Sequence, residues 1–274
     1  MTDREKLRPP LDADALRAEI TGATSFWRQL DVVEQTGSTN ADLLARAAGG
    51  ADIDGSVLIA EHQTAGRGRH GRGWSAAPRA QVTLSVGVRV ADVPPAGWGW
   101  LTLAAGLAVV DAVATETTVE AGLKWPNDVL AGGGKLAGIL AEVTQPFAVI
   151  GIGLNVTQAP EEVAGGGATS LLDQGVATPD RELLVRRLLR ELAERITGWR
   201  RAGGADAQLM ADYRARSLTI GSQVRVELPG GRRIVGIARD IDDQGRLRLE
   251  TGLDDAGKPP ETVVISAGDV VHVR

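Results

Sequence analysis

Cysteine is absent from the 274-residue sequence, and aromatic residues make up only 3% of it. A chain without cysteine has no disulfide, no thiolate ligand for a metal and no cysteine nucleophile. Basic residues are outnumbered too, with 30 lysines and arginines against 35 acidic residues, a formal charge of −5 and a pI near 5.4. This balance argues against a broadly basic nucleic-acid binder, and the lack of cysteine is typical of a cytoplasmic protein.

Long uninterrupted apolar runs are also missing. The longest apolar stretch, Leu101 to Val113, is interrupted by Thr102, Gly106 and Asp111. The N-terminal residues 1–10 are charged and contain no apolar signal region. These features predict no membrane span and no export signal. With 43% hydrophobic residues, the chain has enough apolar material for one large core, alone or with a small second domain.

The part of the chain before Ser217 mixes helical and strand patterns, which predicts an α+β fold with a mixed sheet. One helix is expected after Ser38 as its N-cap, and another after Thr178 as N-cap with Pro179 in the first turn. The remaining expected elements are helices over residues 12–20 and 98–114, strands over 56–61 and 81–90, and a hairpin of 135–143 with 147–156.

After Ser217 the pattern changes to short alternating strands separated by turns rich in glycine, proline and aspartate. The predicted strands cover residues 223–227, 233–238, 246–250, 261–265 and 270–273. Short strands at this spacing are typical of a small SH3-like β-barrel. We therefore expect one domain over residues 1–217 and a second over residues 218–274.

The segment from Gly66 to Trp74 places three arginines among four glycines, in a loop that joins two predicted strands. Ordering so many glycines costs much conformational entropy, so we expect the loop to be mobile until it folds over a ligand. Its arginines are suited to charge-assisted, bidentate contacts with phosphate or carboxylate oxygens. The alternative is a solvated arginine-glycine linker, which is uncommon inside a core sheet.

Two familiar phosphate-binding motifs are excluded by their context. Gly66, Gly68 and Gly71 satisfy G-x-G-x-x-G, but the segment that follows has the period of a strand, whereas the dinucleotide fingerprint opens a helix. A Walker-type loop requires Gly-Lys followed by serine or threonine, and here Lys135 is followed by Leu136.

A second candidate segment is Lys124 to Val129, which precedes a glycine-rich stretch and Lys135. Pro126 stiffens this segment and biases the preceding residue toward an extended conformation, so Asn127 and Asp128 are held at a defined place. A lysine at the start of a buried strand is suited to neutralising a carboxylate or phosphate. The alternatives are an ordinary turn for the Pro-Asn-Asp segment and an edge-strand charge for the lysine.

Five motifs occur in a fixed order along the chain: Gly37-Ser38-Thr39-Asn40, Glu61 to Arg69, Lys124 to Asp128, Gly134 to Leu140 and Gly151 to Val156. Together they make the chain resemble the biotin protein ligases. The resemblance covers the chain from about residue 33 to the C-terminal barrel. The stretch before Trp27 is too short for a DNA-binding domain, so the resemblance is to the monofunctional class that does not repress transcription.

The resemblance implies a reaction in two steps. Biotin and ATP, with Mg²⁺ bridging the phosphates, would give biotinyl-5'-AMP and pyrophosphate, and a lysine of a biotin carboxyl carrier domain would then attack the adenylate. Catalytic roles are implied for Lys135, Arg69 and Asp128, the last of which would accept the proton of the attacking lysine or orient it. Biotin would be bound by Ser38, Thr39, Asn40, Gln63, Arg67, Gly68, Arg69 and Lys135. The nucleotide would be bound by Arg67, Arg69, Arg72, Asn127, Lys135, Asn155 and Trp74, the last stacking on adenine.

Other interpretations remain open. Lipoate ligases have a related fold and the same adenylation chemistry, although the barrel and the arginine loop favour biotin. The related octanoyltransferases use a cysteine nucleophile, which this chain lacks. A nucleic-acid-binding module would use the arginine loop and the barrel, and the acidic pI argues against it. We expect no metal site on His62, His70 or His272, no DNA or membrane partner, and a monomer or weak homodimer.

Overall fold

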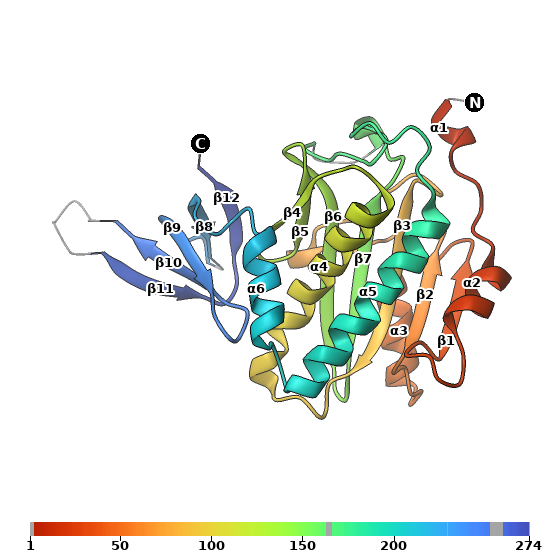
Figure 1. Cartoon of the computed structure of the whole chain (residues 1–274), viewed down its shortest axis with the longest axis horizontal. Helices are drawn as coiled ribbons and strands as arrows, with labels where there is room; N and C mark the ends of the chain where they lie inside the picture. Colours follow the sequence, from red (N-terminus) through yellow and green to blue (C-terminus); the bar gives the residue numbers. More distant parts are fainter. Residues whose placement is uncertain (1–2, 163–165, 229, 253–259, 274) are drawn as a thin grey trace.

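Two β-sheets lie side by side in the computed structural model, which describes residues 3–162, 166–228, 230–252 and 260–273 (Figure 1). The larger sheet has seven strands in the spatial order β1-β2-β3-β7-β6-β5-β4. β1 and β2 are parallel, and the other neighbouring pairs are antiparallel, so the sheet is mixed as predicted. The strands are β1 (Gln29–Val33), β2 (Ser56–Ala60), β3 (Gln81–Arg89), β4 (Ala121–Lys124), β5 (Asp128–Ala131), β6 (Gly134–Thr144) and β7 (Phe147–Asn155).

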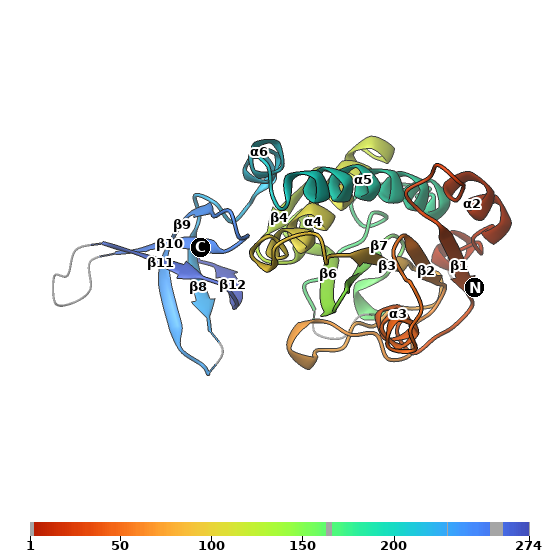
Figure 2. The same ribbon diagram turned by 90° about the horizontal axis from the view of Figure 1, so that it is seen from below.

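Helices cover both faces of this sheet (Figure 2). α2, α4, α5 and α6 lie on one face, whereas α3 and the arginine loop lie on the other, which carries the cavity of the candidate site. The bounds are α1 (Asp3–Lys6), α2 (Ala13–Ile20), α3 (Thr39–Ala48), α4 (Gly99–Glu116), α5 (Arg181–Ala202) and α6 (Ala207–Arg216), with short 3₁₀ turns η1 (Arg69–Gly71), η2 (Pro95–Gly97) and η3 (Pro160–Glu162).

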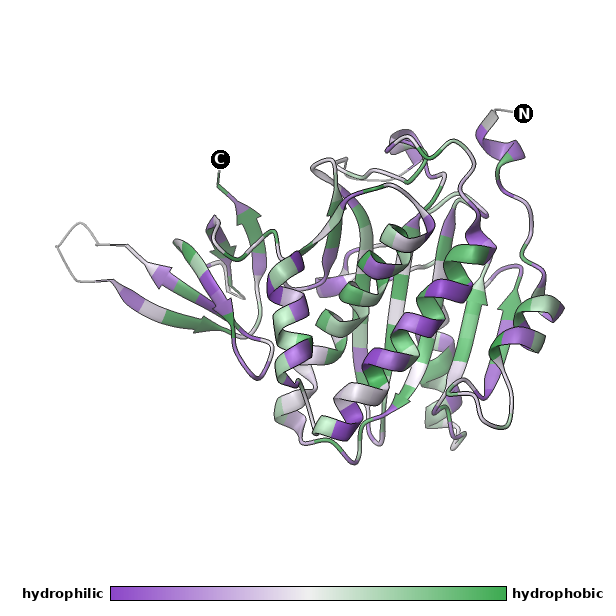
Figure 3. Cartoon of the chain, in the orientation of Figure 1, coloured by the Kyte–Doolittle hydropathy of each residue, from purple (hydrophilic) through white to green (hydrophobic). Residues whose placement is uncertain are grey.

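α4 is the central helix of the core. Most of its side chains between Trp100 and Val113 are buried between the sheet and α5. The segment Pro95–Glu116 is long and apolar enough to cross a membrane, since an 18-residue window in it has a mean hydropathy of 1.4, but 72% of that window is buried inside the protein. An apolar helix that is mostly buried by surrounding protein is typical of a core. α5, by contrast, is amphipathic and turns its polar stripe outward (Figure 3).

Most of the expected elements are confirmed, with one corrected boundary. α3 begins directly after Ser38, whose hydroxyl accepts a hydrogen bond from the Ala41 N–H. The prediction that Thr178 is the N-cap of α5 was wrong, because α5 begins at Arg181 and has Asp180 as its N-cap. The Asp180 carboxylate accepts hydrogen bonds from two N–H groups of the first turn, which fixes the start of the helix. The short elements α1, β1, β4, β5 and α6 were not predicted.

The C-terminal part of the chain forms the second sheet, with five antiparallel strands in the order β11-β10-β9-β8-β12. These are β8 (Gln223–Glu227), β9 (Arg233–Ile241), β10 (Leu247–Thr251), β11 (Glu261–Ile265) and β12 (Asp269–His272), each at a predicted position. Two indoles of the larger domain fasten it. Trp100 Nε1 donates to Asp242 O at 3.1 Å, and Trp125 Nε1 donates to Gly245 O at 3.0 Å. The α+β class is confirmed, and the exact boundary near Leu218 stays a prediction.

Candidate active site

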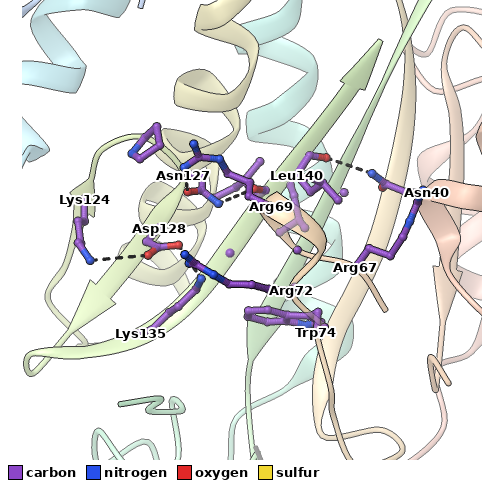
Figure 4. Close-up of a pocket in the computed structure, with 18 of the residues that line it drawn as sticks. Asn40, Arg67, Arg69, Arg72, Trp74, Lys124, Asn127, Asp128, Lys135 and Leu140 are labelled. Atoms are coloured by element: carbon purple, nitrogen blue, oxygen red, sulfur yellow. Dashed lines mark hydrogen bonds and ion pairs between the residues drawn. The ribbon is translucent and has the colours of Figure 1, made fainter. Parts of the chain in front are cut away.

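One cavity of about 330 Å³ is lined by residues of all five sequence motifs and by residues of the small domain. Of the fifth motif only residues 151–153 line it. It lies between the α3 face of the large sheet, the arginine loop and β12. Asn40, Arg67 and Leu140 lie toward one end, and Lys124, Asp128 and Lys135 lie toward the other (Figure 4). The predicted site residues that line it are Ser38, Thr39, Asn40, Gln63, Arg67, Gly68, Arg69, Arg72, Trp74, Asn127, Asp128 and Lys135.

The α3 end of the cavity is polar and rigid. The N-terminus of α3 brings Thr39 and Asn40 into the interior, where their side chains are almost fully buried. Gln63 Oε1 accepts a hydrogen bond from the Thr39 N–H at 2.8 Å. The strand beneath must be glycine at position 151, because a Cβ there would lie 2.2 Å from Asn40 Oδ1. This end is suited to a small polar group that makes several hydrogen bonds.

The arginine loop joins β2 to β3, as predicted, and forms a narrow ribbon. The Gly68 N–H donates to Arg72 O at 2.7 Å, and the Trp74 N–H donates to Gly66 O at 2.8 Å. A Cβ on Gly66 would lie 2.3 Å from Trp74 O, so the close approach of the two sides requires glycine. His70, at the tip, has a φ of 54°, in the left-handed region. The glycines therefore shape the ribbon as well as making it flexible.

The three loop arginines contact different parts of the protein. Arg67 Nη2 lies 3.1 Å from Glu142 Oε2. Arg69 donates to Asn127 Oδ1 at 3.1 Å and to Gly268 O at 3.3 Å. Arg72 forms an ion pair with Asp269 of β12.

Arg69 is the most enclosed of the three arginines. Burial lowers the pKa of the Arg69 guanidinium, and the carboxylates of Asp269 and Asp128 act in the opposite direction. An arginine pKa starts so high that this side chain stays cationic. The cavity therefore keeps a partly desolvated positive charge between the larger domain and the small domain.

Trp74 is fixed at the end of the loop. Its Nε1 donates to Gln81 Oε1 at 2.8 Å. The indole packs against β6 and β7 where both strands have glycine, and a Cβ on Gly153 or Gly138 would lie 2.4 Å or 3.0 Å from it. Lys135 Nζ lies 5.3 Å from the ring centroid. The indole thus forms a held aromatic surface beside a cation.

A carboxylate between two lysines forms the other end of the cavity. Asp128 Oδ1 lies 2.6 Å from Lys135 Nζ, and its Oδ2 lies 4.0 Å from Lys124 Nζ. The register of β4 with β5 places Lys124 opposite Asp128, and a bulge between β5 and β6 brings Lys135 beside them. Asn127 is held by a hydrogen bond from its Nδ2 to Ile139 O at 2.9 Å. Residues 125–127 form the turn that joins β4 to β5, and the Trp125–Pro126 peptide in this turn is cis.

Asn155 differs from the other predicted nucleotide residues because it lies behind the cavity wall. Its Nδ2 donates to Lys135 O at 3.1 Å and to Thr169 O at 2.9 Å, and its Oδ1 accepts from Gln81 Nε2 at 2.6 Å. These contacts use both amide protons and one lone pair of the amide oxygen. Through them Asn155 supports Gln81, which holds Trp74, and the strand that carries Lys135.

Several residues of the site were missed by the sequence reasoning. Glu142 of β6 contacts both Asn40 and Arg67. The small domain adds Asp269, together with the cavity-lining residues Glu227, Val270 and Val271. The barrel therefore contacts the arginine loop directly. No signal in the sequence links them, because Arg72 and Asp269 are 197 positions apart.

The described residues hold no cluster of three or more histidine, cysteine, aspartate or glutamate side chains that could bind a metal ion. Mg²⁺ does not require such a cluster, because it is usually held by one or two carboxylates together with substrate phosphates. Asp128 is a carboxylate at the cationic end of the cavity, so the residues present fit an ion that arrives with a nucleotide.

Comparisons with known proteins agree with this geometry. Residues 33–156 match the biotin/lipoate A/B protein ligase family, and residues 219–273 match the biotin protein ligase C-terminal domain. The chain is 72% identical, over the full length of both proteins, to the biotin–[acetyl-CoA-carboxylase] ligase of Mycobacterium tuberculosis. The chain belongs to the biotin protein ligase family. The resemblance drawn from the five motifs is thus confirmed, as is an SH3-like C-terminal domain of the kind found in this family.

More distant biotin protein ligases share the fold and most of the length. The bifunctional ligase/repressor BirA of Bacillus subtilis is 32% identical over 86% of this chain and 72% of its own. The biotin protein ligase from Aquifex aeolicus, solved in complex with biotin and ATP, superposes with a TM-score of 0.76 at 24% identity, covering 90% of this chain and all of that one. Its likeness shows that the two chains share a fold.

Proposed function

We propose that this biotin protein ligase family member forms biotinyl-5'-AMP from biotin and ATP and transfers the biotin to a lysine of a biotin carboxyl carrier domain. The observation that carries the proposal is one cavity with two unlike ends. One end offers buried hydrogen-bonding side chains of α3, and the other offers Arg69, Lys135 and Asp128. The family membership and the relatives named for biotin and ATP support the same reaction.

Biotin would occupy the α3 end, with its ring system against Ser38, Thr39, Asn40 and Gln63 and the loop backbone at Gly68 above it. Its valeryl chain would point along the cavity toward Lys135. The carboxylate then arrives where the cations are. This orientation follows from matching a polar ring to the polar end and an anion to the cationic end.

In the first step a carboxylate oxygen of biotin bonds to the α-phosphorus of ATP, and the bond from that phosphorus to the pyrophosphate leaving group breaks. Both reactants are anions, so positive charge must lie between them. Lys135 and Arg69 supply it, and Arg67 and Arg72 lie nearby on the loop. Mg²⁺ bound to the phosphates would add further charge neutralisation, with Asp128 as the carboxylate available to it.

Adenine would stack on Trp74, whose position is fixed by Gln81. Asn127 would also contact the nucleotide, beside Arg69, to which it is hydrogen-bonded. Asn155 would belong to the nucleotide site indirectly, because it holds Gln81 and the backbone of Lys135 without lining the cavity itself.

In the second step the amine of the acceptor lysine attacks the carbonyl carbon of the adenylate, AMP leaves, and the amine loses a proton. Asp128 is positioned to take that proton or to orient the lysine, since it already contacts two lysine ammonium groups. The acceptor would be a carrier domain of a biotin-dependent carboxylase, and we expect the ligase to act in the cytoplasm as a monomer or weak homodimer, without DNA or membrane.

The deciding experiment measures pyrophosphate released from ATP when biotin or lipoate is added, and then follows labelled biotin onto a carrier domain. A carrier whose acceptor lysine is replaced by arginine serves as the control. We expect release with biotin and label on the intact carrier alone. Activity with lipoate alone would establish the lipoate ligase, the second candidate, in its place.

A further inference from the structure

A chain of short hydrogen bonds runs behind the α3 end of the cavity and ends on a carboxylate. Glu142 Oε2 accepts from Asn40 Nδ2 at 2.8 Å, and Asn40 Oδ1 accepts from Ser85 Oγ at 2.6 Å. Ser85 Oγ in turn lies 2.6 Å from Thr39 Oγ1. The chain therefore links β6, α3 and β3 in the order Glu142, Asn40, Ser85, Thr39.

Two acceptors on β6 fix the direction of the protons in this chain, because Asn40 Nδ2 donates to Glu142 Oε2 at 2.8 Å and, with a longer bond, to Leu140 O at 3.2 Å. An ionised carboxylate has no proton, so Asn40 must direct its NH₂ group toward Glu142 and its carbonyl oxygen toward Ser85. The single hydroxyl proton of Ser85 is then used on Asn40. Thr39 must accordingly donate its own proton to Ser85, and only lone pairs of Thr39 Oγ1 remain for the cavity.

Water cannot rearrange this chain, because its middle is enclosed. The exposed fraction of Ser85 is 0%, that of Thr39 is 2% and that of Asn40 is 4%. Gln63 does not reverse the direction either, because its Oε1 is an acceptor that takes the backbone N–H of Thr39 at 2.8 Å and lies 3.1 Å from the Thr39 hydroxyl. A Thr39 proton shared with that oxygen would still leave only lone pairs for the cavity. A chain with a charged acceptor at one end and a buried middle has one stable polarity.

We propose that Glu142 is a specificity-determining positioning residue, which makes Thr39 present a hydrogen-bond acceptor to a ligand N–H group. The proposal rests on the function proposed above. The ureido ring of biotin carries N–H donors that match such an acceptor, whereas the dithiolane ring of lipoate carries none. Leaving a buried hydrogen-bonding group unmatched is costly, so the fixed polarity favours the ureido ligand.

Glu142 has a second contact that must be separated from this role. The same Oε2 that accepts from Asn40 lies 3.1 Å from Arg67 Nη2 on the arginine loop. Both side chains of that pair are partly exposed, at 44% for Arg67 and 28% for Glu142. The ion pair is therefore screened by solvent more strongly than the buried chain.

The test compares Glu142→Gln, Ser85→Ala and the double variant by equilibrium binding of biotin without ATP, with thermal unfolding as the check on folding. Each single change should weaken biotin binding by about tenfold, because Glu142→Gln removes the charge that fixes the polarity of the chain and Ser85→Ala removes the hydroxyl in its middle. The double variant should bind biotin about as tightly as the single variant with the lower affinity, because both changes interrupt the same chain of hydrogen bonds. The KM for ATP should stay within about twofold of the wild type.

A matched control is Glu250→Gln, since Glu250 pairs with Arg239 on the exposed side of the small domain. It should leave biotin binding unchanged. Biotin affinity that is unchanged in folded Glu142→Gln, or effects of the two single changes that simply add, would overturn the inference.

The contribution of Arg67 is separated by adding Glu142→Gln to an Arg67→Ala background. We expect the added change to weaken biotin binding further, since the buried chain does not pass through Arg67. No further loss in that background would mean that Glu142 acts only as an ion-pair partner. If the wild-type protein itself failed to bind biotin, the proposed function would fail first, so the two failures are distinguishable.

Discussion

At the scale of single residues, Asp128 offers the sharpest separation of the two chemical steps. Asp128→Asn keeps the shape of the side chain but cannot accept a proton, so transfer of biotin from preformed biotinyl-5'-AMP to the carrier should slow by about a hundredfold or more. Single-turnover transfer, measured with purified adenylate, checks this. We expect asparagine to preserve the fold of β5, and an unfolding temperature equal to that of the wild type is the control. Transfer at the wild-type rate would remove Asp128 as the base and leave it a role in binding.

Arg69 tests whether the loop retains the reactive intermediate. It connects the loop to Asn127 and to Gly268 O, so Arg69→Ala should detach the loop from both and speed the release of biotinyl-5'-AMP. Each lost charge-assisted contact corresponds to about 1.5–3 kcal/mol, or roughly tenfold or more in dissociation rate. Released adenylate should also modify proteins other than the carrier. Arg239→Ala, which removes an exposed arginine of the small domain, is the control.

The arginine loop is the element whose behaviour depends most on ligand and on the small domain. Ordering its glycine-rich residues costs about 1–2 kcal/mol each, which a few contacts offset only in part. We therefore expect trypsin to cleave after Arg67, Arg69 and Arg72 in the free protein and biotinyl-5'-AMP to protect these bonds.

Asp269 should determine how much of the free protein has an ordered arginine loop, because it contacts Arg72, Arg69 and His70 from β12. Asp269→Asn should raise the rate of cleavage without ligand and leave cleavage slow with the adenylate bound. Glu250→Gln is again the matched control. Equal cleavage of the loop with and without adenylate would contradict the expected folding on ligand.

Element by element, the sequence predicts what local chemistry decides. The alternation over residues 81–90 and the cap at Ser38 predict β3 and α3 because both signals are local. β4 and β5 are only four residues long and flank Pro126, so neither has room for a period to develop. The predicted start of α5 was wrong because Thr178 and Asp180 are both suitable N-cap residues. The hydrogen bonds that Asp180 accepts from the first turn make it the N-cap.

At the scale of the whole molecule, the site depends on contacts that no local pattern encodes. The motifs predicted which side chains line the cavity, but not that Asp269 reaches the loop from the far end of the chain or that Glu142 anchors Asn40. They also did not distinguish Asn155, which supports the wall, from residues that face the ligand. Such assignments require the packing of the two domains and of neighbouring strands.

The joint between the domains carries a histidine whose titration should be visible in stability. Partial burial lowers the pKa of His272, and the nearby charge of Lys124 lowers it further. The ring Nε2 lies 3.3 Å from Thr219 Oγ1, which accepts a hydrogen bond from the Trp125 N–H at 3.0 Å. The neutral imidazole is therefore the form that the folded protein favours.

The sign of the pH effect follows from the two states of the chain. An unfolded histidine takes up a proton near pH 6.5, whereas folded His272 takes it up only at lower pH, so acid favours the unfolded state. Between about pH 7.5 and about pH 5 the wild-type protein should thus lose more stability than His272→Gln. Calorimetric unfolding at both pH values checks this, with His62→Gln as a control that removes a histidine elsewhere. Equal losses in wild type and His272→Gln would show that protonation of His272 does not strain the domain joint.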